Sequence, residues 1–390
     1  MTQIDPRIAA LKAEVTAWRR DFHAHPELLY DVERTAGVVA ARLKEFGVDE
    51  VVTGLGRTGV VGVIRGRSTG SGRVVALRAD MDALPIWEET NLPHASRTPG
   101  KMHACGHDGH TAMLLGAARH LAATREFDGT AIVVFQPAEE GGAGARAMIE
   151  DGLIDRFGIQ QFFGMHSLPG LPVGRFGIRS GPVMAATANF DITIDGRGSH
   201  AAKPNDGNDP IVIASHLITA LQTIAARATD PLKSVVVSVC SVQAGETYNV
   251  IPPTAKLKGT VRFLEKAVGL AAEQRFRAIV EHSARMFGAQ AVLDYRYGYP
   301  VTANHAAEAE FAGTVAGTVA ESGADGVELI PPMMGGEDFS YMLEARPGAF
   351  IFIGNGDSAP LHNPGYDFND AALPYGIAYW DGIVRSAMPL

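Results

Sequence analysis

The chain has 390 residues, a formal net charge of −9, 46% hydrophobic residues and 20% charged residues. This composition is ordinary for a globular protein, and the length exceeds the ~100–200 residues of a typical domain, so we expect two domains. The negative charge argues against a nucleic-acid partner, which normally requires a basic face. We expect no apolar run to reach the ~20 residues that span a bilayer, and therefore no membrane partner.

The N-terminal residues and the cysteine content predict a cytoplasmic protein. Residues 1–12 lack a basic segment followed by an apolar stretch, so no secretory signal is expected. The two cysteines, Cys105 and Cys240, do not make a disulfide framework and suit a reducing compartment. In such a compartment a cysteine among histidines is more often a ligand or a nucleophile than a cross-link.

The first predicted element is a helix that begins at Asp5-Pro6 and repeats apolar residues at helical spacing. After it, short β-branched runs alternate with helical stretches. The strand-like runs are residues 59–65, 73–77, 130–135, 161–165 and 349–353, and the helical runs include 33–46, 110–123 and 144–149. This alternation predicts a three-layer α/β domain with a sheet covered on both faces.

The pattern changes after Gly181-Pro182. It then reads strand 189–194, helix 209–228, strand 234–242, strand 254–263, helix 264–287 and strand 290–297. This β-α-β-β-α-β order predicts a smaller, ferredoxin-like α+β domain. Because α/β character returns after Tyr299-Pro300, we interpret residues 186–300 as a domain inserted into a catalytic domain formed by residues 1–185 and 301–390.

Residue types that can bind metals or transfer protons follow four of the predicted strands. Further residues of these types occupy one glycine-rich segment, 102–109. In chain order they are Asp80 and Asp82, then His103, Cys105, His107 and Asp108, then Glu139 and Glu140, and finally His166 and His362. Ligands of open α/β sheets bind beyond the carboxyl ends of the strands. We therefore expect these side chains to converge on one crevice.

The segment Cys105-Gly-His107 places a thiolate and an imidazole two residues apart. Together with carboxylates, these ligands suit zinc, manganese, nickel, cobalt or iron. Asp108 is interpreted as an acid that orients a ligand from behind, and His103 and His110 are minor ligand candidates. The alternative is that Cys105 is a packed thiol and His107 a helix-cap residue.

Glu139 and Glu140 are adjacent, and two neighbouring carboxylates do not both face one ion from a regular backbone. This suggests that one binds metal and the other takes a proton from water, with a pKa raised by a partly dry crevice. The alternative is a solvated acidic turn. His166 and His362 have the corresponding alternative of ordinary hydrogen-bonded histidines.

The segment Gly54-Leu-Gly-Arg-Thr-Gly59 matches the dinucleotide-binding fingerprint, and Asp80 follows at roughly the ~20 residues expected. Residues 60–64 are strand-like, however, so the helix N-terminus that would bind a pyrophosphate is missing from the pattern. A nicotinamide oxidoreductase is therefore kept only as a rival interpretation. The sequence has no Gly-x-Ser-x-Gly elbow and no phosphate-binding loop.

The polar segments also resemble a known family, the aminoacylase/carboxypeptidase-type dinuclear metallo-amidohydrolases. Within it they are most similar to the branch of hippurate hydrolases and indoleacetyl-amino-acid hydrolases. The resemblance runs from His23-Ala-His-Pro-Glu27 to the C-terminus. Its motifs are Arg78-Ala-Asp-Met-Asp-Ala-Leu-Pro85, His103-Ala-Cys-Gly-His-Asp-Gly-His110, Gln136-Pro-Ala-Glu-Glu-Gly141, Met165-His166 and Leu361-His-Asn-Pro364.

The resemblance implies two divalent metal ions, with manganese the first candidate and zinc, nickel, cobalt or iron as alternatives. The implied ligands are Cys105, His107, Glu140, His166 and His362. Glu139 would be the general base, and Asp82 an orienting acid behind a ligand. Relatives outside this branch carry a metal-binding histidine where this chain has Asp80, whose role stays open.

In the smaller domain, the resemblance assigns His200 to an active site, commonly that of a partner subunit, and Asn249 and Arg262 to substrate binding. The alternatives are a turn histidine, a turn asparagine and a surface arginine. Gly335-Gly-Glu337-Asp338 is expected near the crevice, with the role of Glu337 open. The resemblance also implies a homodimer, or a higher homo-oligomer, formed through the smaller domain.

These observations predict a metal-dependent amidohydrolase that cleaves the amide bond of a small N-acyl amino acid. In this hypothesis Glu139 deprotonates the attacking water and His200 stabilises the developing oxyanion. A dipeptidase or an N-carbamoyl amino acid hydrolase is the close alternative. A metal-binding regulatory protein with an inactive site is the rival from another class.

Overall fold

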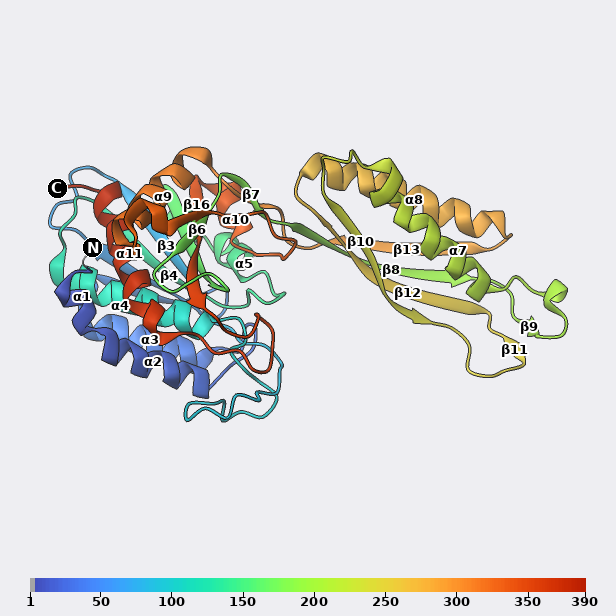
Figure 1. Ribbon diagram of the computed structural model, residues 1–390, viewed down its shortest axis with the longest axis horizontal. Coiled ribbons are helices and arrows are strands. Elements are labelled where there is room, and N and C mark those ends of the chain that lie inside the picture. Colours follow the sequence, from blue (N-terminus) through green and yellow to red (C-terminus); the bar gives the residue numbers. More distant parts are fainter. Residues whose placement is uncertain (1–3) are drawn as a thin grey trace. The chain divides into compact units, whose positions relative to one another are not determined.

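The computed structural model describes residues 4–390, which form two compact units (Figure 1). The larger unit comprises the chain up to Gly181 together with Ala303–Pro331 and Asp338–Leu390, and the smaller unit comprises Pro182–Thr302 and Pro332–Glu337. The sequence pattern assigned residues 332–337 to the larger domain. They lie with the smaller unit because their main chain is bonded to it, through Met333 N to Val183 O and Ala185 N to Gly335 O, both 2.9 Å.

An eight-stranded mixed sheet forms the centre of the larger unit. Its strands, in spatial order, are β1 (Glu50–Leu55), β2 (Gly59–Arg65), β4 (Thr130–Gln136), β3 (Val74–Asp80), β5 (Gln161–Pro169), β16 (Gly348–Gly356), β6 (Phe176–Ile178) and β15 (Val327–Leu329). The four central strands β4, β3, β5 and β16 are mutually parallel, whereas β1 and β2 are antiparallel additions at one edge. The central strands are buried on both faces, as their continuous apolar runs predict.

Helices cover both faces of this sheet. On one face, strand residues such as Leu77, Val133 and Ile351 share a single core with α1 (Pro6–Ala10), α2 (Lys12–Ala24), α3 (Glu33–Glu45), α4 (His107–Thr124), α9 (Ala306–Val319) and α11 (Leu373–Ala387). The other face is covered by α5 (Gly144–Glu150), α6 (Leu153–Phe157) and α10 (Ser340–Ala345), where the rings of Phe339 and Phe350 lie 5.4 Å apart. The predicted three-layer α/β fold class is confirmed.

The smaller unit contains the expected inserted βαββαβ arrangement. Its four-stranded antiparallel sheet has the order β10 (Val235–Gln243), β12 (Thr254–Phe263), β8 (Ala186–Asp195) and β13 (Gln290–Tyr297). Two helices, α7 (Pro210–Thr223) and α8 (Lys266–Met286), pack against each other and share the core of this sheet. The chain enters the unit through β7 (Gly181–Met184), leaves it through β14 (Thr302–Asn304), and adds a short ladder of β9 (Ser199–His200) and β11 (Val250–Ile251).

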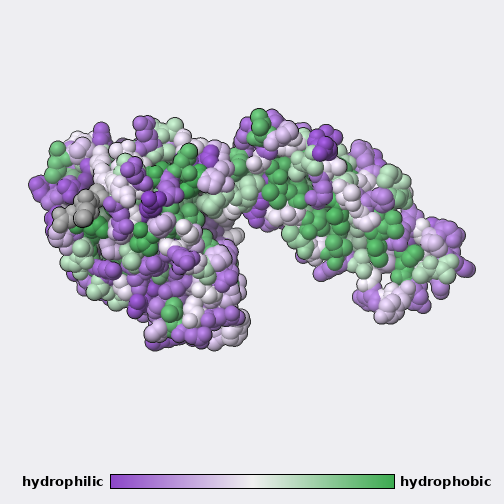
Figure 2. All heavy atoms as spheres, in the orientation of Figure 1, coloured by the Kyte–Doolittle hydropathy of each residue, from purple (hydrophilic) through white to green (hydrophobic). Residues whose placement is uncertain are grey.

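One helical stretch among the described residues, Pro210–Ala228, is long and apolar enough to span a membrane, contrary to the sequence-based expectation. It consists of α7 and a π-helical turn, η2 (Ile224–Ala228). Its side chains Ile213 and Leu217 are buried in the core of the smaller unit, so we interpret it as a core helix. Apolar residues gather on the visible face of this unit (Figure 2), and Ile211 and Val212 of α7 are 47% and 45% exposed.

Candidate metal centre

The central parallel strands bring charged residues to one edge of the sheet. Asp80, the last residue of β3, pairs in register with Gln136, the last residue of β4, and His166 of β5 pairs with Phe352 of β16. The strand predicted over residues 161–165 is longer in the structure: β5 continues through His166 to Pro169 because it keeps pairing with β16. Since parallel strands end at the same edge, the predicted site residues of the larger unit collect there.

Cys105 and His107 flank a glycine that the structure requires. Gly106 has a φ of +85°, and a Cβ atom at this position would lie 2.5 Å from Ser167 Oγ and 2.7 Å from Tyr366 Oη. This glycine lets the thiol point to the sheet edge immediately before α4 begins at His107. His362 reaches the same place from a loop, since its amide donates to Ala104 O at 2.8 Å.

The five predicted metal ligands meet at this point. Cys105 Sγ lies 3.4 Å from His166 Nε2, and Glu140 Oε1 lies 3.3 Å from His362 Nε2 and 4.0 Å from His107 Nε2. The described residues contain five groups of donor atoms that lie within 4.8 Å of one another. Three consist of predicted ligands and the predicted base: Cys105, His107 and His166; Cys105, Glu140 and His362; His107, Glu139 and Glu140. The other two are Asp80, His107 and His110, and Glu139, Glu337 and Asp338. Because Cys105, His107 and Glu140 each belong to more than one group, the set suits two neighbouring ions.

Two buried atoms of this cluster have no hydrogen-bond partner among residues 4–390, namely His107 Nε2 and Glu140 Oε1. The other ring nitrogen of His107 is held by Asp82 O at 2.8 Å, and Nδ1 of His166 is held by Ser167 O at 2.7 Å. Histidine ligands are typically fixed in this way, with the second nitrogen aimed at the metal. Leaving a buried polar atom unpaired costs ~1–3 kcal/mol. The donor set therefore fits a pair of cations.

The electrostatics of the cluster also call for positive charge. Burial would lower the pKa of His107, but Asp80 and Cys105 outweigh it and raise the pKa well above its usual value. The neighbouring Cys105 and Glu140 raise the pKa of His362 to about 10. Burial lowers the pKa of His166 well below its usual range, which keeps this imidazole neutral. In the protein alone, protons on two histidines thus balance charges that divalent cations would balance instead.

Glu139 and Glu140 lie in a turn whose main-chain amides are bound by the side chain of Asp82. The two carboxylate oxygens of Asp82 accept the amides of Glu139 and Glu140 at 2.9 and 3.1 Å. Ala138, just before them, has a φ of +57°, a conformation that non-glycine residues adopt at a cost. Buried contacts therefore hold the turn in an unfavourable backbone conformation, in which a carboxylate oxygen of each glutamate lies within 4.8 Å of a ring nitrogen of His107.

Asp108 does not orient a metal ligand, contrary to the sequence-based interpretation. Its carboxylate lies 2.8 Å from His23 Nδ1 and 3.4 Å from Arg19 Nη1, both on α2. Neighbouring helical residues point about 100° apart, so Asp108 faces away from His107. His103, a minor ligand candidate, is buried beside this group and belongs to none of the donor groups formed by the described residues.

Both carboxylate oxygens of Asp80 are bound by protein side chains, and neither partner was predicted from the sequence. Its carboxylate accepts from Arg78 Nη1 and lies against His110 Nδ1, both at 2.7 Å. His110 Nε2 accepts the amide of Ser167 at 2.9 Å, so Nδ1 carries the proton. Asp80 Oδ2 is 3.6 Å from His107 Nε2. In this arrangement Asp80 supplies negative charge beside the centre.

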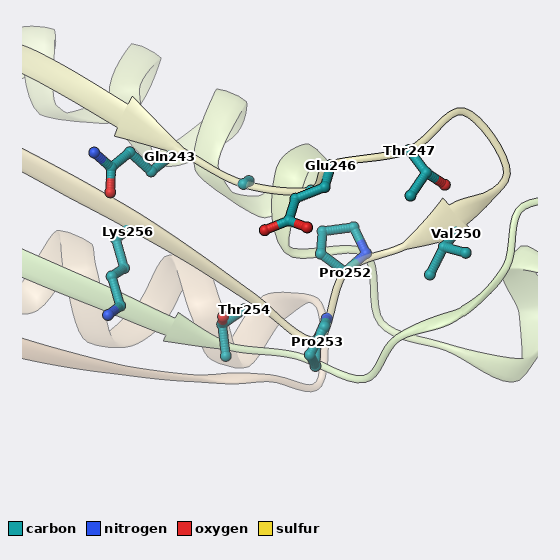
Figure 3. Close-up of a pocket in the computed structure, with 10 residues that line it drawn as sticks. Gln243, Glu246, Thr247, Val250, Pro252, Pro253, Thr254 and Lys256 are labelled. Atoms are coloured by element: carbon teal, nitrogen blue, oxygen red, sulfur yellow. The ribbon is translucent and has the colours of Figure 1, made fainter.

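In the smaller unit the structure brings together two of the three predicted residues. His200 pairs with Val250 in the β9–β11 ladder, and Ala201 N donates to Asn249 O at 3.0 Å. Arg262 lies at the far end of β12, eight residues from Thr254, or ~26 Å along a strand. Beside the β9–β11 ladder is a pocket of about 490 Å³, lined by residues that include Gln243, Glu246, Pro252 and Lys256 (Figure 3), to which we assign no role.

Comparison with known proteins decides the family. A sequence profile of peptidase family M20/M25/M40 matches residues 76–386. The chain belongs to this family. Hippurate hydrolase from Campylobacter jejuni is 40% identical over 376 residues, which cover 96% of this chain and 97% of the relative. N-acetyl-L-cysteine deacetylase from Bacillus subtilis is 41% identical over 370 residues, with 94% and 86% covered.

Two further relatives place this M20 chain among the amidohydrolases. IAA-amino acid hydrolase ILR1-like 4 from Arabidopsis thaliana is 39% identical over 368 residues, covering 92% of this chain and 82% of the relative. The crystal structure of the Bacillus subtilis YXEP protein, described as a dinuclear metal binding peptidase from the M20 family, has a TM-score of 0.84 at 36% identity, covering 97% and 99%. The predicted family is thus confirmed. The chain is a hydrolase of amide bonds, and the oxidoreductase interpretation of Gly54–Gly59 is wrong.

The glycines of that motif serve a β-hairpin instead. The motif runs from Gly54, in β1, through the turn at residues 56–58 to Gly59, the first residue of β2. A Cβ on Gly56 would lie 2.7 Å from the Met148 side chain. β1 itself was missed by the sequence analysis because it is a half-exposed edge strand with little apolar patterning.

Proposed function

We propose that this M20 hydrolase cleaves the amide bond of small N-acyl amino acids, such as N-acetyl, benzoyl or indoleacetyl conjugates. The observation that carries the proposal is the overlapping donor set with its unpaired His107 Nε2 and Glu140 Oε1, next to a second carboxylate, Glu139. Relatives that share ~40% of their residues over nearly the whole chain, and whose names describe such hydrolases, support it.

Two divalent cations, manganese foremost, would be held by Cys105, His107, Glu140, His166 and His362. When bound, such ions lower the pKa of water and polarise a substrate carbonyl. Glu139 would take the proton of the attacking water and pass it to the leaving nitrogen. Asp82 would support this step by holding the amides of both glutamates and the ring of His107.

In the smaller unit, His200 would donate a hydrogen bond to the developing oxyanion, a type of contact worth ~3–4 kcal/mol in the transition state. Asn249 and Arg262 would bind the substrate. Arg262 lies eight residues along β12 from the end of the smaller unit that carries His200 and Asn249. This separation supports the proposal that Arg262 and the His200–Asn249 pair act in two different active sites. We accordingly propose a homodimer, or higher homo-oligomer, acting in the cytoplasm.

The test is a substrate panel on protein of measured metal content. Hippurate, an N-acetyl amino acid, a dipeptide and an N-carbamoyl amino acid would be compared after loading with manganese. Preferential hydrolysis of the first two supports the proposal, and preference for the dipeptide or the carbamoyl compound favours the alternatives. A Glu139→Gln protein that binds metal normally and keeps near-native turnover would refute the base assignment.

A further inference from the structure

The chain crosses from the smaller unit to the larger one between Glu337 and Asp338. Both residues are buried, at 2% and 0% exposure. The peptide group between them is planar and trans, so its carbonyl and its N–H point in opposite directions and turn together. Whatever fixes the carbonyl of Glu337 therefore also sets the direction of the amide of Asp338.

The two ends of this peptide group have different partners. The carbonyl of Glu337 accepts a hydrogen bond from Thr302 Oγ1 at 3.0 Å, within the smaller unit. The amide of Asp338 donates to Oε1 of Glu139 at 3.3 Å, within the larger unit. One rigid group thus joins a buried threonine of the inserted unit to the carboxylate that we assign as the general base.

The side chain of Asp338 anchors the peptide a second time. Its oxygens accept from Gln136 Nε2 at 2.8 and 2.9 Å, from Arg78 Nη2 at 3.0 Å and from the amide of Ala145 at 2.9 Å. Arg78 also donates from Nε to Gln136 Oε1 at 2.8 Å. Gln136 and Ala145 bracket the strained turn that carries Glu139, so Asp338 is tied to the same segment whose carboxylate its amide contacts.

We propose that Asp338 is a positioning residue, and that the Glu337–Asp338 peptide orients the Glu139 carboxylate while Thr302 and the Asp338 side chain hold it from either end. The inference rests on the proposed role of Glu139. The amide of Asp338 contacts Glu139 directly, so the effect of Asp338 would pass through Glu139.

Two substitutions test this positioning. Asp338→Asn keeps the size of the side chain. Its new amide N–H groups would face the N–H donors of Gln136 and Ala145, so hydrogen bonds to Asp338 would be lost. Thr302→Val is isosteric and removes only the hydroxyl that holds Glu337 O. We expect kcat to fall about tenfold to a hundredfold in the first, as small misplacements of a reacting group do, and less steeply in the second. KM and metal content of Thr302→Val would stay near wild type.

Matched controls separate positioning from general damage. Asp49 accepts the amide of Arg65 and the guanidinium of Arg125, both at 2.7 Å, at the opposite edge of the sheet, so Asp49→Asn removes the same kinds of bond. Thr229 donates to Ile224 O at 2.8 Å within the smaller unit, so Thr229→Val matches Thr302→Val. Both controls should retain wild-type kcat.

The exchange rate of the Asp338 amide gives a readout that does not need turnover. Thr302→Val should speed its exchange with solvent, whereas Thr229→Val should not. If the wild-type protein hydrolyses no substrate of the panel, the proposed function fails, and amide exchange alone decides the positioning inference. If the wild type is active but both Asp338→Asn and Thr302→Val keep wild-type kcat, the inference is overturned. Should Asp338→Asn fail to fold, the Thr302→Val result decides in the same way.

Discussion

Two glycines offer a controlled measurement of how tightly the metal-binding loop is packed. Gly106 has φ +85° and ψ +11° at the start of α4, and Gly152 has φ +88° and ψ +19° at the start of α6. Their backbones are nearly identical, but a Cβ on Gly152 would meet nothing within 4 Å, whereas one on Gly106 would press on Ser167 Oγ and Tyr366 Oη. The two hydroxyls are themselves 3.1 Å apart.

Alanine at either site incurs the left-handed backbone penalty of about 1–2 kcal/mol. At Gly106 the overpacking adds about 1–3 kcal/mol, so the total loss should be about 2–5 kcal/mol. Gly106→Ala should also lower metal content, because the change displaces Cys105 and His107, while Gly152→Ala should leave it unchanged.

The difference in stability between Gly106→Ala and Gly152→Ala can be measured by denaturant unfolding of chelator-treated protein. Tryptophan fluorescence reports on the larger unit, in which both glycines lie. All three tryptophans, at positions 18, 87 and 380, belong to the larger unit. Equal losses of stability in Gly106→Ala and Gly152→Ala would show that the loop yields to the extra methyl group, and the packing argument would be wrong.

Three further predictions concern Cys105, His23 and Tyr30. Cys105→Ser should remove most of the bound metal, since Cys105 belongs to two donor groups, while the exposed Cys240→Ser should not, as metal analysis would show. Burial lowers the pKa of His23, but Asp108 outweighs it and raises the pKa to about 9, so His23 stabilises the fold below pH 6.5 and loses this as pH rises through 9. His23→Gln should cost roughly 3 kcal/mol at pH 6 and little at pH 10, and a constant difference would contradict this. Tyr30→Phe should cost about 1 kcal/mol in unfolding, from the lost 2.7 Å bond to Gly142 O, and no measurable loss would contradict it.

Much of the fold could be predicted because its strands are apolar and bounded by turns. The ranges expected for β2, β12 and β13 agree with the structure residue by residue. The edge strand β1 escaped because half of its side chains face solvent, and β5 ran longer than expected because pairing with β16, not local composition, sets its end. Long-range pairing is the part of strand definition that a single sequence does not contain.

The donor residues could be predicted because strand ends fix their place in space. The direction in which a helical side chain points around the helix axis is harder to predict from sequence. Asp108 follows His107 directly, yet it faces Arg19 and His23 on α2. The role of Asp338 could not be foreseen either, since its partners Arg78 and Gln136 are 260 and 202 residues away in the chain. The motif around Asp338 indicated a place near the crevice and nothing about its bonds.

Residue type alone does not separate a metal ligand from its support at this centre. Asp80, Asp82 and Asp338 are all buried carboxylates at the same sheet edge, and each uses both oxygens on the protein: Asp80 on Arg78 and His110, Asp82 on two main-chain amides, and Asp338 on Arg78, Gln136 and Ala145. Glu140 Oε1 and His107 Nε2 are buried as well, yet they lack such partners within residues 4–390. A bound cation would offset the ~1–3 kcal/mol that such an unpaired buried atom costs. Saturation of the three aspartates therefore supports the proposed ligand set of Cys105, His107, Glu140, His166 and His362, with the aspartates holding these donors in place.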